Sequence, residues 1–326
     1  MKKLAFIVLL LLLFLVSCFP DGSENNGGIP EGENMGYDYY AINMNTDFPV
    51  PTLLPTTEGE RAKVIILIGQ SNATGCSLTS YLKEGVSEEK YLEFENGYDN
   101  VLINFSLDNQ KYTSGGEFLP VDLSCAAGEG YFGPEVGMAE TLSAAFPNEK
   151  LFILKFTMSG YSLNYHWLYD GERASIYNAF IEFANTYLNS LEELGYDTDL
   201  EAICWMQGES DTTDFKAARY YYNTEKFVSY LRSDLSSYAE GNIYFVDAGI
   251  SSSPYCEPAY PEINEAKKAF SDTSEYNIYF STIDAGLTTL YEPESNPDLG
   301  HYDALSELAL GRMFGSELVK ILNSED

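Results

Sequence analysis

The chain has little positive charge. Of its 326 residues, 18 are Lys or Arg and 50 are Asp or Glu, which gives a net charge of −32 with both histidines neutral. A surface of this charge repels nucleic acid and anionic lipid head groups, so we expect neither as a partner. Neutral substrates such as sugars are unaffected by that field.

Histidine is almost absent as well, since the chain holds only His166 and His301. There is no His-Glu-x-x-His motif and no pair of Cys-x-x-Cys motifs, which leaves no plausible zinc site. The phosphate-binding motif Gly-x-x-x-x-Gly-Lys-Ser/Thr is also missing. We therefore expect neither a metal nor an organic cofactor.

Only one long apolar run occurs, from Leu4 to Val16, behind Lys2 and Lys3 and just before Cys18. A short apolar run behind positive charges is typical of an export signal and is too short for a comfortable membrane span. The sequence around Cys18 looks like a bacterial lipobox, which predicts a signal peptide over 1–18 and a lipid on Cys18. The protein would then be an exported lipoprotein anchored at the periplasmic face or the cell surface. An ordinary cleaved signal or an uncleaved anchor is the alternative.

Residues 19–57 are rich in Gly, Asn, Glu and Pro and are predicted to form a flexible tether. Residues 58–326, about 270 in number, match the size of one large domain. The four cysteines of this domain would meet an oxidising compartment, and they allow three pairings. Sequence does not choose among Cys76, Cys125, Cys204 and Cys256, and we take a Cys76–Cys125 disulfide as the expectation.

Apolar strand-like segments alternate with helix-like segments along this domain. Strands are predicted at 64–68, 151–156, 201–206, 242–247 and 278–283, and helices at 134–145, 176–194, 213–235, 263–270 and 303–322, the last capped by Asp303. Residues 77–129 lack a regular period and are interpreted as an insertion over the sheet. The alternation predicts an α/β fold, a three-layer α/β/α sandwich around a mainly parallel five-stranded sheet.

Three polar, glycine-bearing turns follow three of the predicted strands, at 69–72, 159–162 and 207–211. Parallel strands end at one edge of a sheet, so these turns are expected to converge on one crevice. Ser71, in the first turn, is either a nucleophile there or only a cap of the following helix.

A serine nucleophile needs an imidazole base, and the base needs an acid that fixes its tautomer. His301 has Asp298 three residues before it on one short loop. His166 lies between Tyr165 and Trp167, which indicates a substrate-facing or packing position. A surface histidine at a helix start is the alternative for His301.

Five short blocks together resemble the sialate O-acetylesterase and acetylxylan esterase branch of the SGNH hydrolases. They are Gly69-Gln70-Ser71-Asn72, Phe132-Gly133-Pro134-Glu135, Ser159-Gly160-Tyr161-Ser162 with Trp167, Gln207-Gly208-Glu209-Ser210-Asp211 and Asp298-x-x-His301. The order of the blocks makes the similarity specific, and it spans nearly the whole domain. The resemblance implies an SGNH, flavodoxin-like fold and a carbohydrate esterase.

The resemblance also implies a role for each matching residue. Ser71 would be the nucleophile, His301 the general base and acid, and Asp298 the acid that orients His301. The oxyanion would be held by the backbone N–H groups of Ser71 and Gly160 and by the side-chain amide of Gln207. Asn72 is a second amide near the nucleophile. Supporting or substrate-binding positions are Gln70, Asn72, Glu209, His166 and Trp167.

Two positions depart from the family pattern. Ser159-Gly160 stands where the family often has two glycines, which leaves the backbone oxyanion donor open. Tyr302 follows His301 where proline is usual, which leaves the triad intact. Glu209 either braces the active-site loops or is a solvated acid. Ser210 is a rival nucleophile, but no base lies more readily beside it than beside Ser71.

These features predict a lipid-anchored serine esterase that removes acetyl groups from carbohydrate of the acetylxylan or sialate type. A glycosidase needs only two facing carboxylates, but it would leave the Ser71, Gln207 and His301 blocks unexplained. A non-catalytic carbohydrate-binding lipoprotein of the same fold is the more serious alternative, and it has no need for an intact triad.

Overall fold

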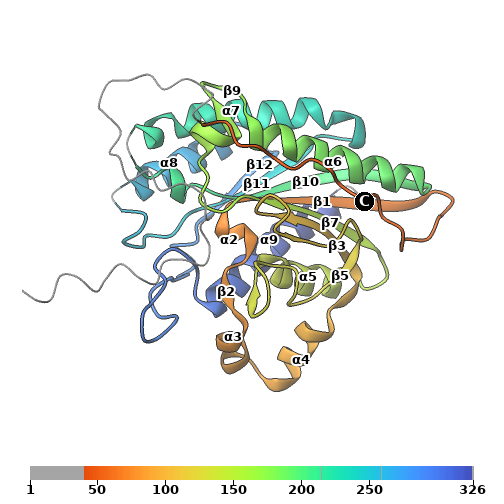
Figure 1. The fold of residues 1–326 in the computed structure, drawn as a ribbon, viewed down its shortest axis with the longest axis horizontal. Coiled ribbons are helices and arrows are strands. Elements are labelled where there is room, and N and C mark those ends of the chain that lie inside the picture. Colours follow the sequence, from red (N-terminus) through yellow and green to blue (C-terminus); the bar gives the residue numbers. More distant parts are fainter. Residues whose placement is uncertain (1–39, 214, 258, 325–326) are drawn as a thin grey trace, which may run out of the picture.

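Helices cover both faces of a central sheet in the computed structural model, which describes residues 40–213, 215–257 and 259–324 (Figure 1). One face carries α6 (Ser175–Glu193), α7 (Lys216–Asp234) and α8 (Tyr260–Ser271). The other face carries α5 (Pro134–Ala145) and α9 (Ala304–Ser324), which pack on each other. The predicted three-layer α/β/α sandwich is therefore confirmed.

The central sheet has eight strands in the order β12-β11-β10-β1-β7-β3-β4, with β5 also paired to β3. Their bounds are β1 Glu60–Gly69, β3 Tyr98–Leu107, β4 Tyr112–Thr113, β5 Leu119–Val121, β7 Leu151–Thr157, β10 Tyr196–Met206, β11 Tyr244–Ala248 and β12 Asn277–Phe280. The pairings from β12 to β3 are parallel, and β4 and β5 are antiparallel to β3. The sheet is mainly parallel as predicted, but the prediction of five strands was wrong.

The main missing strand is β3, inside the segment that was interpreted as an insertion. This segment also forms helices α3 (Thr79–Gly85) and α4 (Glu88–Asn96). Strand β3 pairs with β7 along seven residue positions, from Val101 to Leu107. Its apolar run is interrupted by Asn104 and Ser106, which are nevertheless buried. These polar residues prevented the prediction of β3, because a buried parallel strand normally has a continuous apolar sequence.

Strand β1 lies in the middle of the sheet between β10 and β7. The side chains from Val64 to Ile68 are fully buried, as their β-branched run predicts. Gly69 ends the strand with φ +152°, and a Cβ at this position would overlap the carbonyl oxygen of Met206. Only glycine therefore allows β1 and β10 to approach each other this closely where they end.

Short elements complete the fold around the strand ends. They are α2 Ser71–Thr74, the antiparallel pair β2 Ser77–Leu78 with β6 Tyr131–Phe132, the antiparallel pair β8 Leu168–Tyr169 with β9 Glu172–Arg173, a π-helical turn Leu163–Trp167 and 3₁₀ turns Glu209–Asp211 and Ser236–Tyr238.

Asp303 stands directly before α9, where it was predicted to cap the helix. Its carboxylate instead accepts hydrogen bonds from the backbone N–H groups of Leu290, Tyr291 and Glu292. The carboxylate of Glu292 accepts the N–H of Ala304 at 2.7 Å, in the first turn of α9. Asp303 thus holds the preceding loop in place, and the carboxylate of Glu292 caps the start of α9.

Residues 40–57 lie along the domain instead of forming the free end of a tether. The ring of Phe48 packs edge-on against Phe183, and the backbone N–H of Ile42 donates to the hydroxyl of Ser175. Thr52 donates twice to the carboxylate of Glu117, through its N–H and its hydroxyl. The expected signal peptide and Cys18 lie outside the described residues, as does the start of the tether.

The four cysteines of the domain are all buried thiols, so the expected Cys76–Cys125 disulfide is wrong. The Sγ atom of Cys125 lies 3.7 Å from Asp122, and its carbonyl accepts from Lys155. Burial raises the pKa of both Cys204 and Cys125 well above the ordinary thiol value.

Within the described ranges, no helix combines the length and apolar character that crossing a membrane requires.

Candidate active site

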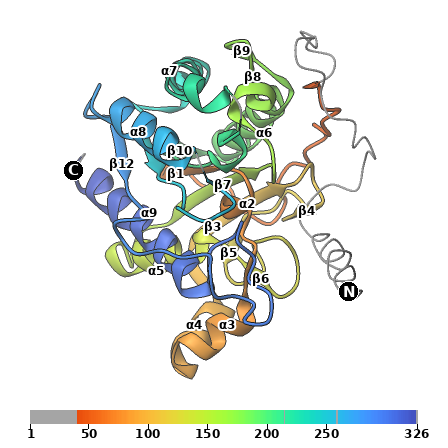
Figure 2. The same ribbon diagram turned by 90° about the vertical axis from the view of Figure 1, so that its left-hand side faces the viewer.

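Ser71 begins the short helix α2 directly beyond the carboxyl end of β1. The register places Gly69 beside Thr157 of β7 and Met206 of β10, so the three following turns start at one edge of the sheet. Figure 2 looks toward this edge, with α2 near its centre. The predicted convergence of the turns is confirmed. No side chain in the described part of the chain caps α2, so Ser71 does not serve as its cap.

His301 and Asp298 form a close pair on the loop before α9. The Nδ1 atom of His301 lies 2.6 Å from Oδ2 of Asp298, and the other carboxylate oxygen accepts the N–H of Gly300 at 3.0 Å. Partial burial raises the pKa of Asp298, but the hydrogen bonds from His301 and Gly300 outweigh it and hold the pKa below its usual range. Asp298 is therefore ionised at neutral pH and fixes the orientation of the imidazole.

Asn72 ties the helix of Ser71 to the loop of His301. Its Nδ2 donates to the carbonyl of Gly300 at 3.2 Å, and its Oδ1 accepts the N–H of Tyr302 at 3.2 Å. The residues on both sides of His301 are thus bonded to the residue that follows Ser71. This bridge brings the two ends of the domain together, although 229 positions separate their numbers, 72 and 301.

Glu209 completes the connection from the loop after β10. Its Oε1 accepts the Nδ2 of Asn72 at 2.6 Å, and the side chain is only 2% exposed. Burial raises the pKa of Glu209, while Asn72, Lys267 and His301 oppose the rise. Gln70 supports the same loop, because its Oε1 accepts the N–H of Ser210 at 3.2 Å. Both residues therefore lie within the candidate site as braces.

Two backbone N–H groups near this edge are candidates for an oxyanion hole. Among the described residues, neither the N–H of Ser71 nor that of Gly160 has a hydrogen-bond partner. Gly160 is exposed and has φ +78°, which favours glycine. The preceding Ser159 is anchored through its N–H to Asp108 at 2.7 Å. Unpaired N–H groups on a fixed backbone are the donors that an oxyanion hole requires.

The structure corrects the expected role of Gln207 as an oxyanion donor. Its Nε2 donates to Oδ2 of Asp211 at 2.6 Å and to the carbonyl of Tyr161 at 3.3 Å. Its Oε1 accepts the hydroxyl of Tyr220 at 3.0 Å, and the side chain is fully buried. Both amide hydrogens are therefore used inside the protein. The amide of Asn72 is likewise committed, to Glu209 and Gly300.

His166 and Trp167 belong to the packing around the site. Trp167 is fully buried against Trp205, with ring centroids 5.1 Å apart, so it has no surface to offer a substrate. His166 accepts the N–H of Ser162 at its Nδ1, and its ring lies edge-on to Tyr161. Burial lowers the pKa of His166 to about 4, with a further contribution from Lys216. This histidine is therefore neutral at neutral pH.

Asp211 is a supporting residue to which the sequence analysis gave no role. It is fully buried, and its carboxylate accepts the N–H groups of Leu163 and Asn164 as well as the amide of Gln207. These bonds join the loop after β10 to the loop that carries Gly160. The sequence contained a signal for this role, because Asp211 is the last residue of the polar turn that begins with Gln207.

Two buried carboxylates near the site are paired with lysines. Lys155 donates to Glu135 at 2.6 Å, and Lys267 donates to Asp247 at 2.5 Å. Within the described ranges, no three His, Cys, Asp or Glu side chains are grouped so that they could hold a metal ion. The groups that remain for chemistry at this edge are a hydroxyl, an imidazole, a carboxylate and two N–H donors.

Comparisons with known proteins identify the family of the chain. The family described as "carbohydrate esterase, sialic acid-specific acetylesterase" matches residues 61–320. No curated protein matches the chain.

Solved structures with a similar fold include NanS, with a TM-score of 0.58 and 14% identity over 83% of this chain and 100% of that one. A protein from Arabidopsis thaliana has a TM-score of 0.54 and 17% identity over 79% of this chain and 98% of that one. A carbohydrate acetylesterase from Xanthomonas citri has a TM-score of 0.50 and 14% identity over 79% of this chain and 54% of that one. At these identities the likeness concerns the fold.

Proposed function

This chain belongs to the family of carbohydrate esterases described as sialic acid-specific acetylesterases, and we propose that it removes O-acetyl groups from carbohydrate with Ser71, His301 and Asp298 as its catalytic triad. The family makes it a carboxylic ester hydrolase. The assignment of the triad is supported chiefly by the Asn72 bridge, which bonds the residue after Ser71 to both neighbours of His301.

In the proposed mechanism, the Nε2 atom of His301 removes the proton of the Ser71 hydroxyl as Oγ attacks the acetyl carbonyl. The N–H groups of Ser71 and Gly160 stabilise the negative charge that develops on the carbonyl oxygen. His301 then donates the proton to the departing sugar oxygen, which leaves an acetyl group on Ser71. Asp298 stays ionised and stabilises the imidazolium.

Water completes the cycle by the same chemistry. His301 takes a proton from a water molecule, whose oxygen attacks the acetyl carbon of the acyl-enzyme. The tetrahedral intermediate collapses, the bond to Oγ breaks and His301 returns the proton to Ser71. Acetate leaves, and no other reactant is consumed.

Removal of the nucleophile tests the proposal, with a second serine as a matched control. Ser71→Ala should lower kcat for an aryl acetate by at least about 10⁴-fold. Ser210→Ala should retain nearly full activity, because the bonds of Ser210 to Gln70 and Lys216 use its backbone and not its hydroxyl. Activity that survives Ser71→Ala would refute the mechanism. Complete inactivity of the native chain on every acetyl ester would favour a sugar-binding protein without catalysis.

We also propose that the chain is exported as a lipoprotein and anchored through Cys18. The support is the short apolar run that ends at this residue behind two lysines. Radiolabelled palmitate should enter the native chain and not the Cys18→Ser variant, which should leave the membrane fraction. Equal labelling of both chains would contradict the anchor.

A further inference from the structure

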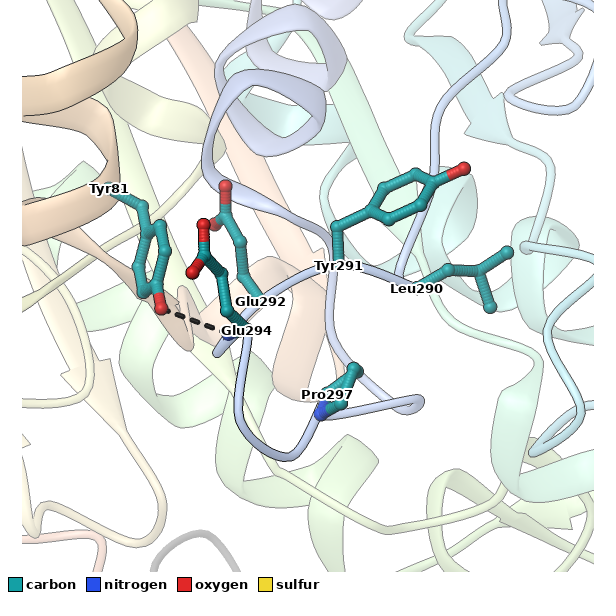
Figure 3. Close-up of a pocket in the computed structure, with 6 residues that line it drawn as sticks. All are labelled: Tyr81, Leu290, Tyr291, Glu292, Glu294 and Pro297. Carbon is teal, nitrogen blue, oxygen red and sulfur yellow. Dashed lines mark hydrogen bonds between the residues drawn. The ribbon is translucent and has the colours of Figure 1, made fainter.

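A surface cavity of about 350 Å³ lies on the loop that carries Asp298. It is lined by Tyr81, Leu290, Tyr291, Glu292, Glu294 and Pro297 (Figure 3). Pro297 directly precedes Asp298, so the wall of the cavity and the proposed triad share one stretch of chain. Its volume lies within the range of about 300 to 1,000 Å³ that is typical of small-ligand sites.

The cavity is built on fixed backbone. Asp303 holds the N–H groups of Leu290, Tyr291 and Glu292, so one wall is pinned at three successive residues. The N–H of Asp298 donates to the carbonyl of Glu292 at 2.8 Å, which closes the loop on itself.

The opposite wall is fixed through α3. The hydroxyl of Tyr81 accepts the N–H of Glu294 at 3.0 Å, the bond drawn in Figure 3. A ligand would therefore meet a site whose shape exists before binding, which limits the entropy lost on binding.

The walls combine apolar rings with carboxylates. Tyr291 is 65% exposed and Leu290 is 44% exposed, although both are large and apolar. Such walls suit a pyranose, whose C–H face packs on an aromatic ring while its hydroxyls donate to carboxylates. Figure 3 shows the ring of Tyr291 pointing away from Glu292 and Glu294, so the ring and the carboxylates would contact different parts of the sugar. Glu294 supplies those acceptors, together with the Oε1 atom of Glu292, whose Oε2 accepts the N–H of Ala304.

The electrostatic field in the cavity is negative. Neither Lys nor Arg is among the six lining residues. Burial raises the pKa of Glu292, and the charges of Asp303 and Glu84 raise it further. A sugar carboxylate would meet repulsion from these carboxylates here.

We propose that this cavity is a sugar subsite that accepts residues without negative charge and disfavours anionic sugars such as sialic acid. The inference rests on the proposed esterase function and narrows its substrate class. The chain would thus differ in preference from the sialic acid specificity named in its family description.

Substrates of different charge test the proposal. We expect a higher kcat/KM for an O-acetylated neutral oligosaccharide than for O-acetylated sialic acid, with an aryl acetate as the sugar-free reference. Glu294→Gln should raise kcat/KM for the sialic acid ester about threefold at low salt and leave the aryl acetate unchanged. Glu225→Gln, an exposed acid on α7 over the opposite face of the sheet, is the matched control and should change neither rate.

The ring of Tyr291 provides a second, charge-free test. Tyr291→Ala should raise KM for the neutral oligosaccharide about fivefold and leave the aryl acetate unaffected. The control is Tyr222→Ala, which removes another exposed ring, on α7. Equal effects of both variants would overturn the role of Tyr291.

Binding by the Ser71→Ala variant separates this inference from the esterase proposal. Calorimetry should detect the neutral oligosaccharide with at least threefold tighter binding than sialic acid, whether or not any ester is hydrolysed. Tighter binding of sialic acid, or a faster rate on its ester that Glu294→Gln leaves unchanged, would overturn the subsite. Inactivity of the native chain on all esters would overturn the esterase and leave the binding result to decide the subsite.

Discussion

The amide of Asn72 donates to the carboxylate of Glu209 at 2.6 Å, and both side chains are buried. The same amide group holds Gly300 and Tyr302, the two neighbours of His301. A single side chain therefore connects the turn after β1, the turn after β10 and the loop before α9. Glu209 fixes the amide, and the amide fixes the backbone of the proposed base.

Loss of this bridge should reduce the rate without preventing folding. Asn72→Ala is expected to lower kcat about a hundredfold, because a displaced imidazole no longer meets the Ser71 hydroxyl in line. Asn223→Ala is the control, since it removes another buried amide, bonded to Asn164 at 2.8 Å, that does not touch the His301 loop. Steady-state kinetics and circular dichroism of both variants check the result. Similar kcat losses in the two would show that Asn72 acts only through stability.

The amide of Gln207 is hydrogen-bonded inside the protein, so its loss should affect stability rather than the rate. Gln207→Ala should destabilise the fold by about 2 to 4 kcal/mol, because it leaves a hole in a buried site and the buried carboxylate of Asp211 loses one of its three hydrogen-bond donors. Denaturant unfolding measures this loss. An oxyanion donor would behave differently, with a fall in kcat of about a hundredfold or more and an unchanged free energy of unfolding. That pattern would restore the role that the family resemblance assigns to Gln207.

The sequence was sufficient to predict the framework of the site. Strands such as Val64–Ile68 have strong β-branched runs, and each ends at a glycine-bearing turn, so their parallel order and common edge could be anticipated. Asp298 and His301 could be paired because only three positions separate them.

Features set by tertiary contacts could not be predicted. Strand β3 was not predicted because it contains the polar residues Asn104 and Ser106. Neighbouring elements bury these residues, and the local sequence pattern does not indicate their burial. The direction of the Gln207 amide is fixed by Asp211 and Tyr161, and no local signal in the sequence reports that this amide is used inside the protein. Residues 40–57 pack on the domain through side chains such as Phe48, which a composition rich in Gly and Pro did not reveal.

The partly buried position of His166 should appear in the pH dependence of stability. Its pKa falls to about 4 in the folded chain from the ordinary value of 6.5, so the unfolded chain binds a proton more tightly between these values. The stability linked to His166 is fully present above pH 6.5 and is lost as pH falls toward 4. The loss amounts to about 3 kcal/mol at most.

A substitution of each histidine isolates this effect, because the chain has only two. His166→Gln should flatten the decline of the unfolding free energy between pH 6.5 and pH 4. His301→Gln serves as the control and should keep the decline that His166 causes. Urea unfolding at several pH values gives the slopes, and an unchanged slope in His166→Gln would contradict the burial of a neutral imidazole.

Lys155 is expected to be essential for stability, because it neutralises a carboxylate in the layer beneath Ser71. Its ammonium donates to Glu135 at 2.6 Å and to the carbonyl of Thr74 at 2.9 Å, at the end of the helix that Ser71 begins. Both charged side chains are completely buried. Burial raises the pKa of Glu135, and Lys155 opposes that rise. Burial raises the pKa of the nearby Glu307 well above the usual range, and the charge of Glu135 raises it further.

Lys155→Met should therefore destabilise the fold by about 3 to 5 kcal/mol, since it leaves the Glu135 carboxylate buried without a cation. Glu135→Gln removes the stranded charge, so Lys155→Met combined with Glu135→Gln should recover part of the loss. Urea unfolding of the native chain, the two single variants and the double variant forms a double-mutant cycle. A matched pair at the surface, Lys320 and Glu317, should give a coupling energy below about 1 kcal/mol in the same cycle. Strict additivity of the Lys155 and Glu135 substitutions would show that the two charges do not stabilise each other.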